Sequence, residues 1–306
     1  MSDRIPPQER RVRRLLRWAT TRLRACLAEA PAGSAETPYL DSLLLLSLAS
    51  GESSERLMAS MPDELPRPAV ARFAELVEQR CTGMPISYIR GRKEFYGRDF
   101  TVSPDVLVPR PDTEILVETA LEIIDAWDGE PPHVHDTCTG TGCVAITIAA
   151  ERPSVAVSAS DISPAALEIA RRNSHDILAR PLRGIWKSDL LEGLEQKWAE
   201  LDLERPAIIT ANPPYLTDNE YRIMRSSGWP EPEQALRAGT DGLDLIRRLS
   251  GQAVALLPPG GYLVMEMGSQ QGARGAEILE ERGFSGVDIR RDLAGRERVA
   301  VARKRN

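Results

Sequence analysis

The chain has 306 residues, 42% of them hydrophobic, and a formal net charge of −6. This length exceeds the roughly 100 to 200 residues of one typical domain, so we expect two domains. The negative balance argues against a protein that holds long nucleic acid mainly through phosphate contacts, although a small basic patch stays compatible with it. No apolar run approaches the roughly 20 residues of a membrane helix, and the N-terminus lacks a signal-peptide apolar segment, so we expect a cytoplasmic protein without a membrane partner.

The first 84 residues show helical periodicity. Apolar residues recur at spacings of three and four between residues 12 and 27, with arginines on the other face, and residues 40–48 and 70–77 continue the pattern. Proline and glycine residues separate these segments, which predicts a small helical bundle. The arginine-rich face is interpreted as a solvated surface, with RNA or protein docking as the alternative.

The four cysteines are Cys26, Cys81, Cys138 and Cys143. Only the last two are close in sequence, and neither a second pair nor nearby histidines would complete a zinc site. We therefore expect four reduced thiols and no bound metal.

Residues 87–108 are rich in aromatic and β-branched side chains, which predicts a hairpin or two strands that join the domains. A helix is expected over residues 114–124. Beyond it, apolar strands and helices alternate, which is typical of βαβ units with a parallel sheet. Strands are expected near residues 134, 155–159, 185, 208–211 and 262–267, and helices near residues 144–150, 165–172, 243–257 and 273–282. Two late strands, 286–291 and 298–301, are expected to pair antiparallel.

Ligands of such sheets bind outside the carboxyl ends of the strands. The stretch "HDTCTGTGCVAI" ends its strand at Asp136, and Gly140 and Gly142 then allow a tight turn ahead of a helix whose free amides face a ligand. Asp161 ends the next strand and suits a pair of ribose hydroxyls. Structural roles in the turn and at the helix start are the alternatives. Together these residues predict an adenosine-containing cofactor, either NAD or S-adenosylmethionine.

The third strand is followed by Asp189, whose carboxylate could lie beside an adenine amino group or could start the next segment as a helix acid. The fourth strand is followed by "NPPY", residues 212–215. The Asn212 side-chain oxygen and the Pro213 carbonyl can accept both hydrogens of a planar NH2 group, an arrangement that a hydride-transfer site does not need. Tyr215 can cover the planar group and face a sulfonium charge.

These residues resemble the N-methyltransferases that use S-adenosylmethionine. More closely, the chain is similar to the family that methylates the glutamine side-chain nitrogen of bacterial peptide chain release factors. The resemblance runs from about residue 40 to residue 303 and includes "GMPISYIRGRKEFYGRDF", "VLVPRPDTEILVE", "DTCTGTG", "NPPY", "EPEQALRAGTDGLDL", "LVMEMG" and "DLAGRERV". NPPY also occurs in nucleic-acid methyltransferases, whereas "PRPDTE" ahead of the glycine loop is more specific to this family.

The resemblance implies an α/β fold in which a Rossmann-like seven-stranded methyltransferase domain, residues 111–306, follows a small helical bundle domain, residues 1–84. A β-hairpin linker, residues 85–110, joins the two, and the helical domain helps to bind the release factor. The implied reaction transfers a methyl group from S-adenosyl-L-methionine to N5 of the glutamine in the Gly-Gly-Gln motif of class I release factors, leaving S-adenosyl-L-homocysteine. We expect a monomer with no stable nucleic-acid partner.

The resemblance also implies the site residues. The expected cofactor-binding residues are Cys138, Thr139, Gly140, Thr141, Gly142, Asp161, Asp189, Leu190 and Asn212. The expected catalytic and substrate-binding clamp is Asn212, Pro213, Pro214 and Tyr215. Arg110 and Glu114 match the PRPDTE pattern as further substrate-binding candidates, while on physical grounds alone Glu114 is a first-turn helix acid and Arg110 its partner.

Two positions depart from the family pattern. The family usually has glycine where this chain has Cys138, and some relatives have an aromatic residue where it has Leu190. A cysteine at the first position is a feature of the sister family that methylates a glutamine in ribosomal protein L3, which is the nearest alternative function. Methylation of an exocyclic amine in nucleic acid, such as adenine N6, is a more distant one, which the acidic balance disfavours.

Overall fold

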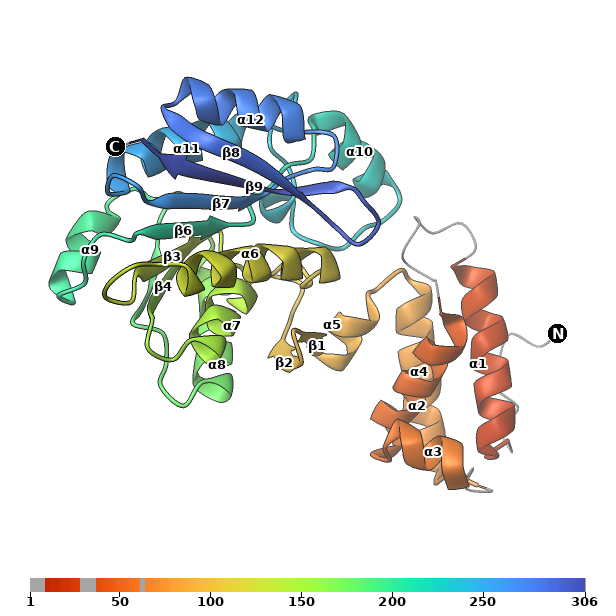
Figure 1. Ribbon diagram of the computed structural model, residues 1–306. Helices are drawn as coiled ribbons and strands as arrows, with labels where there is room; N and C mark the ends of the chain where they lie inside the picture. Colours follow the sequence, from red (N-terminus) through yellow and green to blue (C-terminus); the bar gives the residue numbers. More distant parts are fainter. Residues whose placement is uncertain (1–8, 28–36, 61–63, 306) are drawn as a thin grey trace. The chain divides into compact units, whose positions relative to one another are not determined.

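The computed structural model describes residues 9–27, 37–60 and 64–305 (Figure 1). The chain divides into two compact units, Met1–Gly91 with Ile223–Pro230 and Arg92–Arg222 with Glu231–Asn306. In the described part of the chain, no helix is long and apolar enough to cross a membrane.

The first unit is helical, as predicted. Its helices are α1 (Val12–Cys26), α2 (Pro38–Ser50), α3 (Ser54–Ser60), α4 (Arg67–Cys81) and α5 (Ile86–Arg90). The apolar faces of α1, α2 and α4 form one core, in which Leu15, Leu45 and Phe73 are fully buried. A buried ion pair joins α4 to α2, since Arg80 Nε lies 2.9 Å from Asp41 Oδ2.

The expectation of four reduced thiols is wrong for two of them. Cys26 and Cys81 form a disulfide, with their Cα atoms 5.4 Å apart. The two cysteines are 55 residues apart in sequence but end α1 and α4, which pack side by side through the edge contact of Trp18 with Phe73. Cys138 and Cys143 are free.

The connector is only partly as expected. Strands β1 (Arg92–Phe95) and β2 (Arg98–Thr101) form an antiparallel hairpin whose turn residues, Tyr96 and Gly97, both have positive φ, as a two-residue type I′ turn requires. The start of the segment is the short helix α5 instead of a strand. Pro85 precedes this helix and Gly91 ends it in the left-handed conformation, and these boundary signals outweigh the β-type composition.

The second unit contains a seven-stranded sheet in the order β5-β4-β3-β6-β7-β9-β8, which confirms the expected fold class. The strands are β3 (His133–Thr137), β4 (Ala156–Asp161), β5 (Gly184–Lys187), β6 (Ile208–Ala211), β7 (Tyr262–Glu266), β8 (Phe284–Arg291) and β9 (Glu297–Lys304). The first five in the sheet are parallel, and β9 pairs antiparallel with both β7 and β8, as predicted for the late strands. The strand order reverses at β3, which places a ligand-binding crevice at the carboxyl ends of β3 and β6.

Helices cover both faces of this sheet (Figure 1). They are α6 (Glu114–Asp125), α7 (Cys143–Glu151), α8 (Pro164–Ile177), α9 (Leu194–Glu200), α11 (Asp244–Leu256) and α12 (Gly272–Glu281). Between β6 and β7 the chain also forms α10 (Asp218–Ser226), which has no buried residue and whose last four residues belong to the first unit. The single turns η1 (Pro111–Thr113) and η2 (Glu233–Ala235) precede α6 and α11. Successive strand residues point to opposite faces, so Ile208 joins the core beneath α6 and α7 and Ile209 joins the core beneath α9, α11 and α12.

Candidate active site

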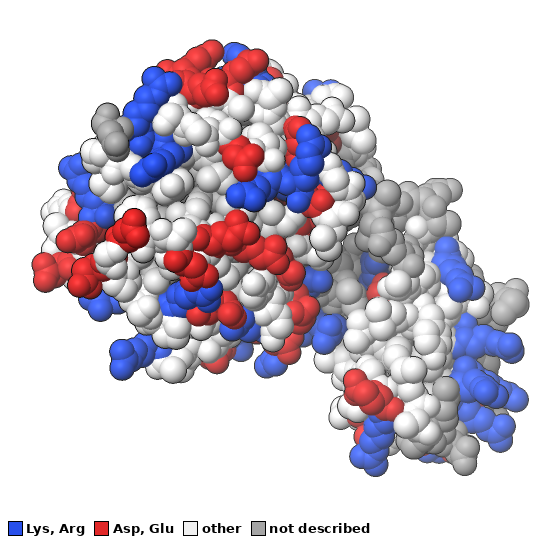
Figure 2. Space-filling model, viewed as in Figure 1, with Lys and Arg blue, Asp and Glu red and all other residues white. Residues whose placement is uncertain are grey.

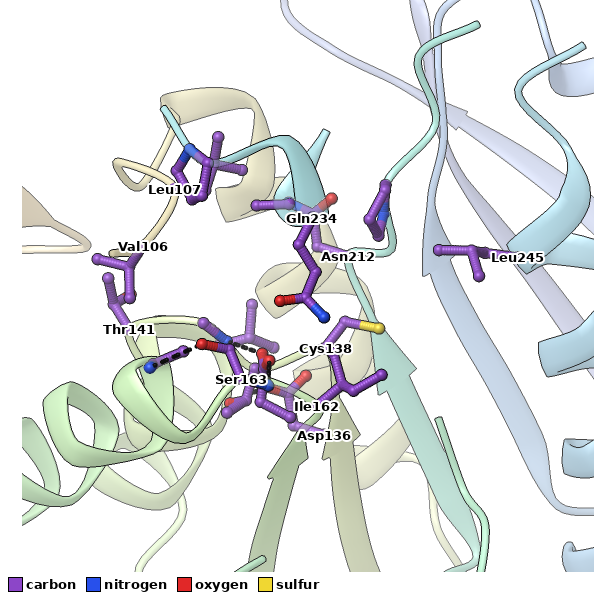
Figure 3. A pocket seen from close by; sticks show the side chains of 18 of the residues that line it. Val106, Leu107, Asp136, Cys138, Thr141, Ile162, Ser163, Asn212, Gln234 and Leu245 are labelled. Atoms are coloured by element: carbon purple, nitrogen blue, oxygen red, sulfur yellow. Dashed lines mark hydrogen bonds between the residues drawn. The ribbon is translucent and has the colours of Figure 1, made fainter. Parts of the chain in front are cut away.

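A cavity of about 310 Å³ lies at the carboxyl ends of the parallel strands (Figure 3). Of the expected site residues, its wall contains Arg110, Cys138, Thr139, Gly140, Thr141, Asp161, Asp189, Leu190, Asn212 and Pro214. Gly142, Pro213, Tyr215 and Glu114 are not part of this wall. The sequence-predicted residues therefore gather at one site, with these four behind or beside it.

The glycine loop connects β3 to α7 through three residues with positive φ: Cys138 at 57°, Gly140 at 53° and Gly142 at 81°. Only glycine adopts this conformation without strain, which explains a glycine preference at the Cys138 position. A Cβ on Gly142 would also lie 2.8 Å from Ile146 Cδ1 in the first turn of α7. The loop therefore brings its backbone close to the cavity, at the cost of one strained cysteine.

Two carboxyl groups flank this loop. Asp161 Oδ2 accepts from Gly140 N at 2.9 Å, and Asp161 Oδ1 accepts from Ser163 N at 2.9 Å. Each carboxylate oxygen keeps a further lone pair, so Asp161 can still accept from a hydroxyl in the cavity. Burial raises the pKa of Asp161 despite these two hydrogen bonds. Such a pair of acceptor atoms fits a ribose diol.

Asp136 lies deeper, at the end of β3, and is buried. It accepts from Thr139 Oγ1 at 2.5 Å and from Thr210 Oγ1 at 2.7 Å. Burial raises the pKa of Asp136 to about 7, although both hydroxyl groups favour its charged form. Burial and the negative charges of Asp161 and Asp136 also raise the pKa of the Cys138 thiol, so Cys138 stays protonated.

The far wall combines a polar and an apolar residue. Asp189 Oδ2 accepts from Arg248 Nη2 at 2.8 Å, so the strand-end acid is paired with α11. Leu190 is buried with a φ of 57°, and its carbonyl accepts from Thr137 Oγ1 at 3.0 Å. Leucine thus supplies an apolar wall where relatives with an aromatic residue would have a ring.

Asn212 directly follows β6, and its side-chain Nδ2 donates to Thr113 Oγ1 at 3.2 Å. The described chain offers Asn212 Oδ1 no donor, which leaves this oxygen able to accept from a ligand in the cavity. Pro213 and Pro214 after it are buried and fix the backbone direction. Figure 3 shows Asn212 at the cavity together with Cys138 of the glycine loop.

Tyr215 turns away from this cavity wall. Its hydroxyl donates to Glu266 Oε1 across 3.5 Å, and burial raises the pKa of Tyr215, so the phenol stays protonated. The role of Tyr215 in covering the substrate group stays a prediction.

The proposed pairing of Arg110 with Glu114 is wrong. Arg110 Nη2 lies 2.6 Å from Oε2 of the buried Glu231, whose Oε1 accepts from Val108 N at 3.0 Å. Glu114 Oε1 accepts from Tyr96 N at 3.1 Å in the hairpin turn. The ion pair of Arg110 therefore links the "PRPDTE" segment to the "EPEQ" segment beside the cavity. Glu114 links the hairpin turn to the start of α6.

Sequence reasoning missed four residues of this region: Thr113, Glu231, Gln234 and Glu266. Gln234 extends from η2 into the cavity (Figure 3). All four lie within motifs that carried the family resemblance, namely "PRPDTE", "EPEQ" and "LVMEMG". The roles of Thr113, Glu231 and Glu266 were not predicted because each depends on a contact with a residue far away in sequence. Gln234 was missed because its role depends on where η2 lies at the cavity.

Comparison with known proteins decides the family. A release factor glutamine methyltransferase from Neisseria gonorrhoeae is 39% identical over 274 residues, which cover 89% of this chain and 95% of the relative. The chain belongs to the release factor glutamine methyltransferase family. Two further relatives have the same description. The one from Burkholderia pseudomallei is 40% identical over 86% of this chain and 91% of the relative. The one from Moorella thermoacetica is 36% identical over 92% of this chain and 99% of the relative.

Two family models match this member of the release factor glutamine methyltransferase family. The PrmC N-terminal domain matches residues 14–91, and the Methyltransferase small domain matches residues 112–226. The second match includes the glycine loop, Asp161 and the NPPY tetrad. The resemblance inferred from the motifs is thus confirmed at the level of the family.

Proposed function

We propose that this protein transfers a methyl group from S-adenosyl-L-methionine to N5 of the glutamine in the Gly-Gly-Gln motif of class I peptide chain release factors. The observation that carries the proposal is the orientation of Asn212, whose Nδ2 is engaged by Thr113 while Oδ1 stays available at the cavity. An acceptor atom fixed beside a glycine loop suits an acceptor substrate with N–H groups. Family membership supports the same substrate.

The cavity residues fit the methyl donor. Asp161 can accept from the ribose hydroxyls, Leu190 offers an apolar surface for adenine, and the glycine loop allows close approach of the backbone. Asp136 and Asp161 supply negative charge for a ligand that carries a sulfonium and an ammonium group. When bound, this group supplies an electrophilic methyl on positively charged sulfur. The product is S-adenosyl-L-homocysteine, and the residues need no metal.

The acceptor nitrogen is an amide, whose lone pair is delocalised and weakly nucleophilic. Asn212 Oδ1 lines the cavity and can accept one of its hydrogens. We propose that the carbonyl of the neighbouring Pro213, which lies beside the wall, accepts the other. Two acceptors favour the more tetrahedral and more positive nitrogen of the transition state. One carbon–sulfur bond breaks, one carbon–nitrogen bond forms, and the nitrogen then loses a proton to solvent. No general base among the residues is required.

We assign residues 1–84 to docking of the release factor, residues 85–110 to a linker and residues 111–306 to methyl transfer. We further propose that the protein acts as a monomer in the cytoplasm and has no stable nucleic-acid partner. Its net charge of −6 supports a protein substrate.

The test of the substrate is transfer of labelled methyl to purified class I release factor and to ribosomal protein L3, offered separately at equal concentration. Label on the release factor alone is the expected result. Label on L3 alone would assign the protein to the sister function, for which Cys138 is the corresponding sequence feature. Label on neither protein would overturn the proposal.

A further inference from the structure

Gln271, the residue before α12, has an amide side chain whose hydrogen-bonding groups are all engaged. Its Nε2 donates to the Tyr215 carbonyl at 3.0 Å and to the Gly242 carbonyl at 3.2 Å. Its Oε1 accepts from Gly268 N at 2.9 Å. The opposite orientation would place the amide oxygen against two carbonyl oxygens and the NH2 group against an N–H, so the three partners fix which way the amide faces.

The backbone of Gln271 is held as firmly as its side chain. Its N–H donates to the Gly268 carbonyl at 2.9 Å, and its own carbonyl accepts from Gly275 N at 2.7 Å in the first turn of α12. The residue therefore starts from a fixed point between the end of β7 and α12, and a group mounted on regular elements positions its partners precisely.

Gly242 shows how closely the segments approach one another here. Its φ is 73°, and a Cβ at this position would overlap the Tyr215 carbonyl oxygen and lie 2.6 Å from Gln271 Nε2. A glycine is therefore needed both for the backbone conformation and for the space. This close approach is a second observation, independent of the hydrogen bonds, that Gln271 and the Tyr215 carbonyl are packed together.

The chain directly after the tetrad is paired with the segment that precedes α11. Leu216 N donates to the Leu236 carbonyl at 2.8 Å, and the Leu216 carbonyl accepts from Ala238 N at 2.8 Å. The partner segment leads into α11, whose Leu245 lines the cavity. Gln271 thus cross-links the end of the tetrad to a segment that continues into the cavity wall.

The NPPY tetrad is consequently anchored at both ends. Asn212 Nδ2 is engaged by Thr113 at 3.2 Å at one end, and the Tyr215 carbonyl is engaged by Gln271 at the other. The two prolines between them have φ fixed near about −65°, so few backbone torsions remain free. The direction of the Pro213 carbonyl therefore depends on both anchors.

We propose that Gln271 is a positioning residue for the methyl acceptor: by holding the Tyr215 carbonyl, it sets the direction in which the Pro213 carbonyl meets the substrate amide. Gln271 is not part of the cavity wall, so it acts through the tetrad and not on the substrate itself. The inference rests on the proposed function, which assigns the Pro213 carbonyl to a substrate N–H. Loss of this anchor would let the end of the tetrad turn and would misplace one of the two acceptors.

The test compares Gln271→Ala, Gln271→Met and Gln271→Glu in the full-length protein with release factor as substrate. Methionine fills similar space without N–H groups, and glutamate retains an acceptor for Gly268 N but sets a second oxygen against two carbonyls. We expect each variant to lower kcat on the order of 10- to 100-fold, the cost of a small misplacement at a reacting centre. The affinity for S-adenosylmethionine, measured by calorimetry, should stay within about threefold of wild type.

A double-mutant cycle asks whether the loss passes through the Tyr215 carbonyl. Gly242→Ala should also lower kcat, because its Cβ displaces this carbonyl, and the combined loss with Gln271→Ala should be smaller than the product of the two. Gly295→Ala is the control for positive φ, since Gly295 has a φ of 77° and open space around it. Gln270→Ala, at the exposed neighbouring glutamine, is the control for Gln271. Both controls should retain wild-type kcat.

Hydrogen exchange supplies a readout that does not depend on activity. The amides of Leu216 and Ala238 should lose protection in Gln271→Ala and keep it in Gln270→Ala, because their hydrogen bonds adjoin the anchor. Wild-type kcat in all three Gln271 variants, or full recovery of kcat by Gln271→Met alone, would show that the positioning role is wrong while the proposed function stands. If wild type transfers no methyl group to release factor, the proposed function fails and the assigned role in methyl transfer fails with it. Unchanged exchange in Gln271→Ala would then also contradict the anchor.

Discussion

The side chains of Asn212 and Thr113 are joined by a 3.2 Å hydrogen bond although 99 residues separate them in sequence. Asn212 begins the NPPY tetrad after β6, and Thr113 ends the single turn η1 ahead of α6. This contact links the "PRPDTE" motif to the "NPPY" motif and gives each a physical reason for its polar residue.

Replacement of Asn212 by alanine tests the acceptor role. Asn212→Ala should lower kcat by roughly 10² to 10³, the usual cost of removing one group that stabilises a transition state, with nearly unchanged cofactor affinity. Rapid-quench methyl transfer and calorimetry measure the two quantities. The exposed Asn219→Ala on α10 serves as control. A collapse of cofactor affinity in Asn212→Ala would show that this residue holds the cofactor instead.

The strained Cys138 predicts a tolerant and an intolerant substitution. The unfolding free energy of Cys138→Gly should lie within about 1 kcal/mol of the wild-type value, because relief of the strain at positive φ offsets the added entropy of the unfolded backbone and the lost side-chain contacts. Cys138→Val should lose about 2 kcal/mol, since a β-branched residue is poorly suited to a φ of 57°. Denaturant unfolding of both variants gives the comparison. Equal unfolding free energies for the two variants would show that the positive φ of residue 138 does not strain the backbone.

The ion pair between Arg110 and the buried Glu231 should stabilise the loop beside the cavity. We expect Arg110→Ala to cost about 1 to 2 kcal/mol of unfolding free energy, a value reduced from that of a fully buried pair because Arg110 is half-exposed. A double-mutant cycle with Glu231→Gln measures the coupling. The exposed pair of Arg92 and Asp99, 3.9 Å apart, is the control and should couple by less than about 0.5 kcal/mol. Equal coupling in the two pairs would argue against the structural role of Glu231.

The raised pKa of Asp136, about 7 in the folded protein against an ordinary 3.8, predicts a pH dependence of stability. Its protonated form favours the fold, so its contribution is fully present below the unfolded pKa and is lost as the pH rises through about 7. The unfolding free energy of wild type relative to Asp136→Asn should therefore decline between these values and level off above them. Chemical denaturation at several pH values measures the difference, and a difference that rises with pH would be contrary to this account.

Much of the sheet was predictable because its strands alternate regularly with helices along the chain. Parallel strands place their carboxyl ends on one edge, so the glycine loop, Asp161, Asp189 and Asn212 could be expected at one site. The short helices α3, α5, α9 and α10 were not predicted, since each spans nine residues or fewer and α5 has a β-type composition. The equally short α7 was predicted because the glycine loop marks its start.

Contacts between segments far apart in the chain could not be predicted from the sequence. The pairing of Cys26 with Cys81 depends on how two helix ends meet, and the choice of Glu231 over Glu114 as the partner of Arg110 depends on a loop that returns to the cavity. Neither has a periodic signal. The single-residue departure at Cys138, by contrast, was visible in sequence, and its positive φ supplies the physical reason for the family's glycine.

The most direct test of the central claim is tandem mass spectrometry of class I release factor after incubation with the protein and S-adenosylmethionine. We predict one added methyl group, located on the side-chain nitrogen of the Gly-Gly-Gln glutamine. A short incubation of the same length with Asn212→Ala in place of the wild type should give no such product. A methyl group on any other residue, or none on the release factor at all, would contradict the account.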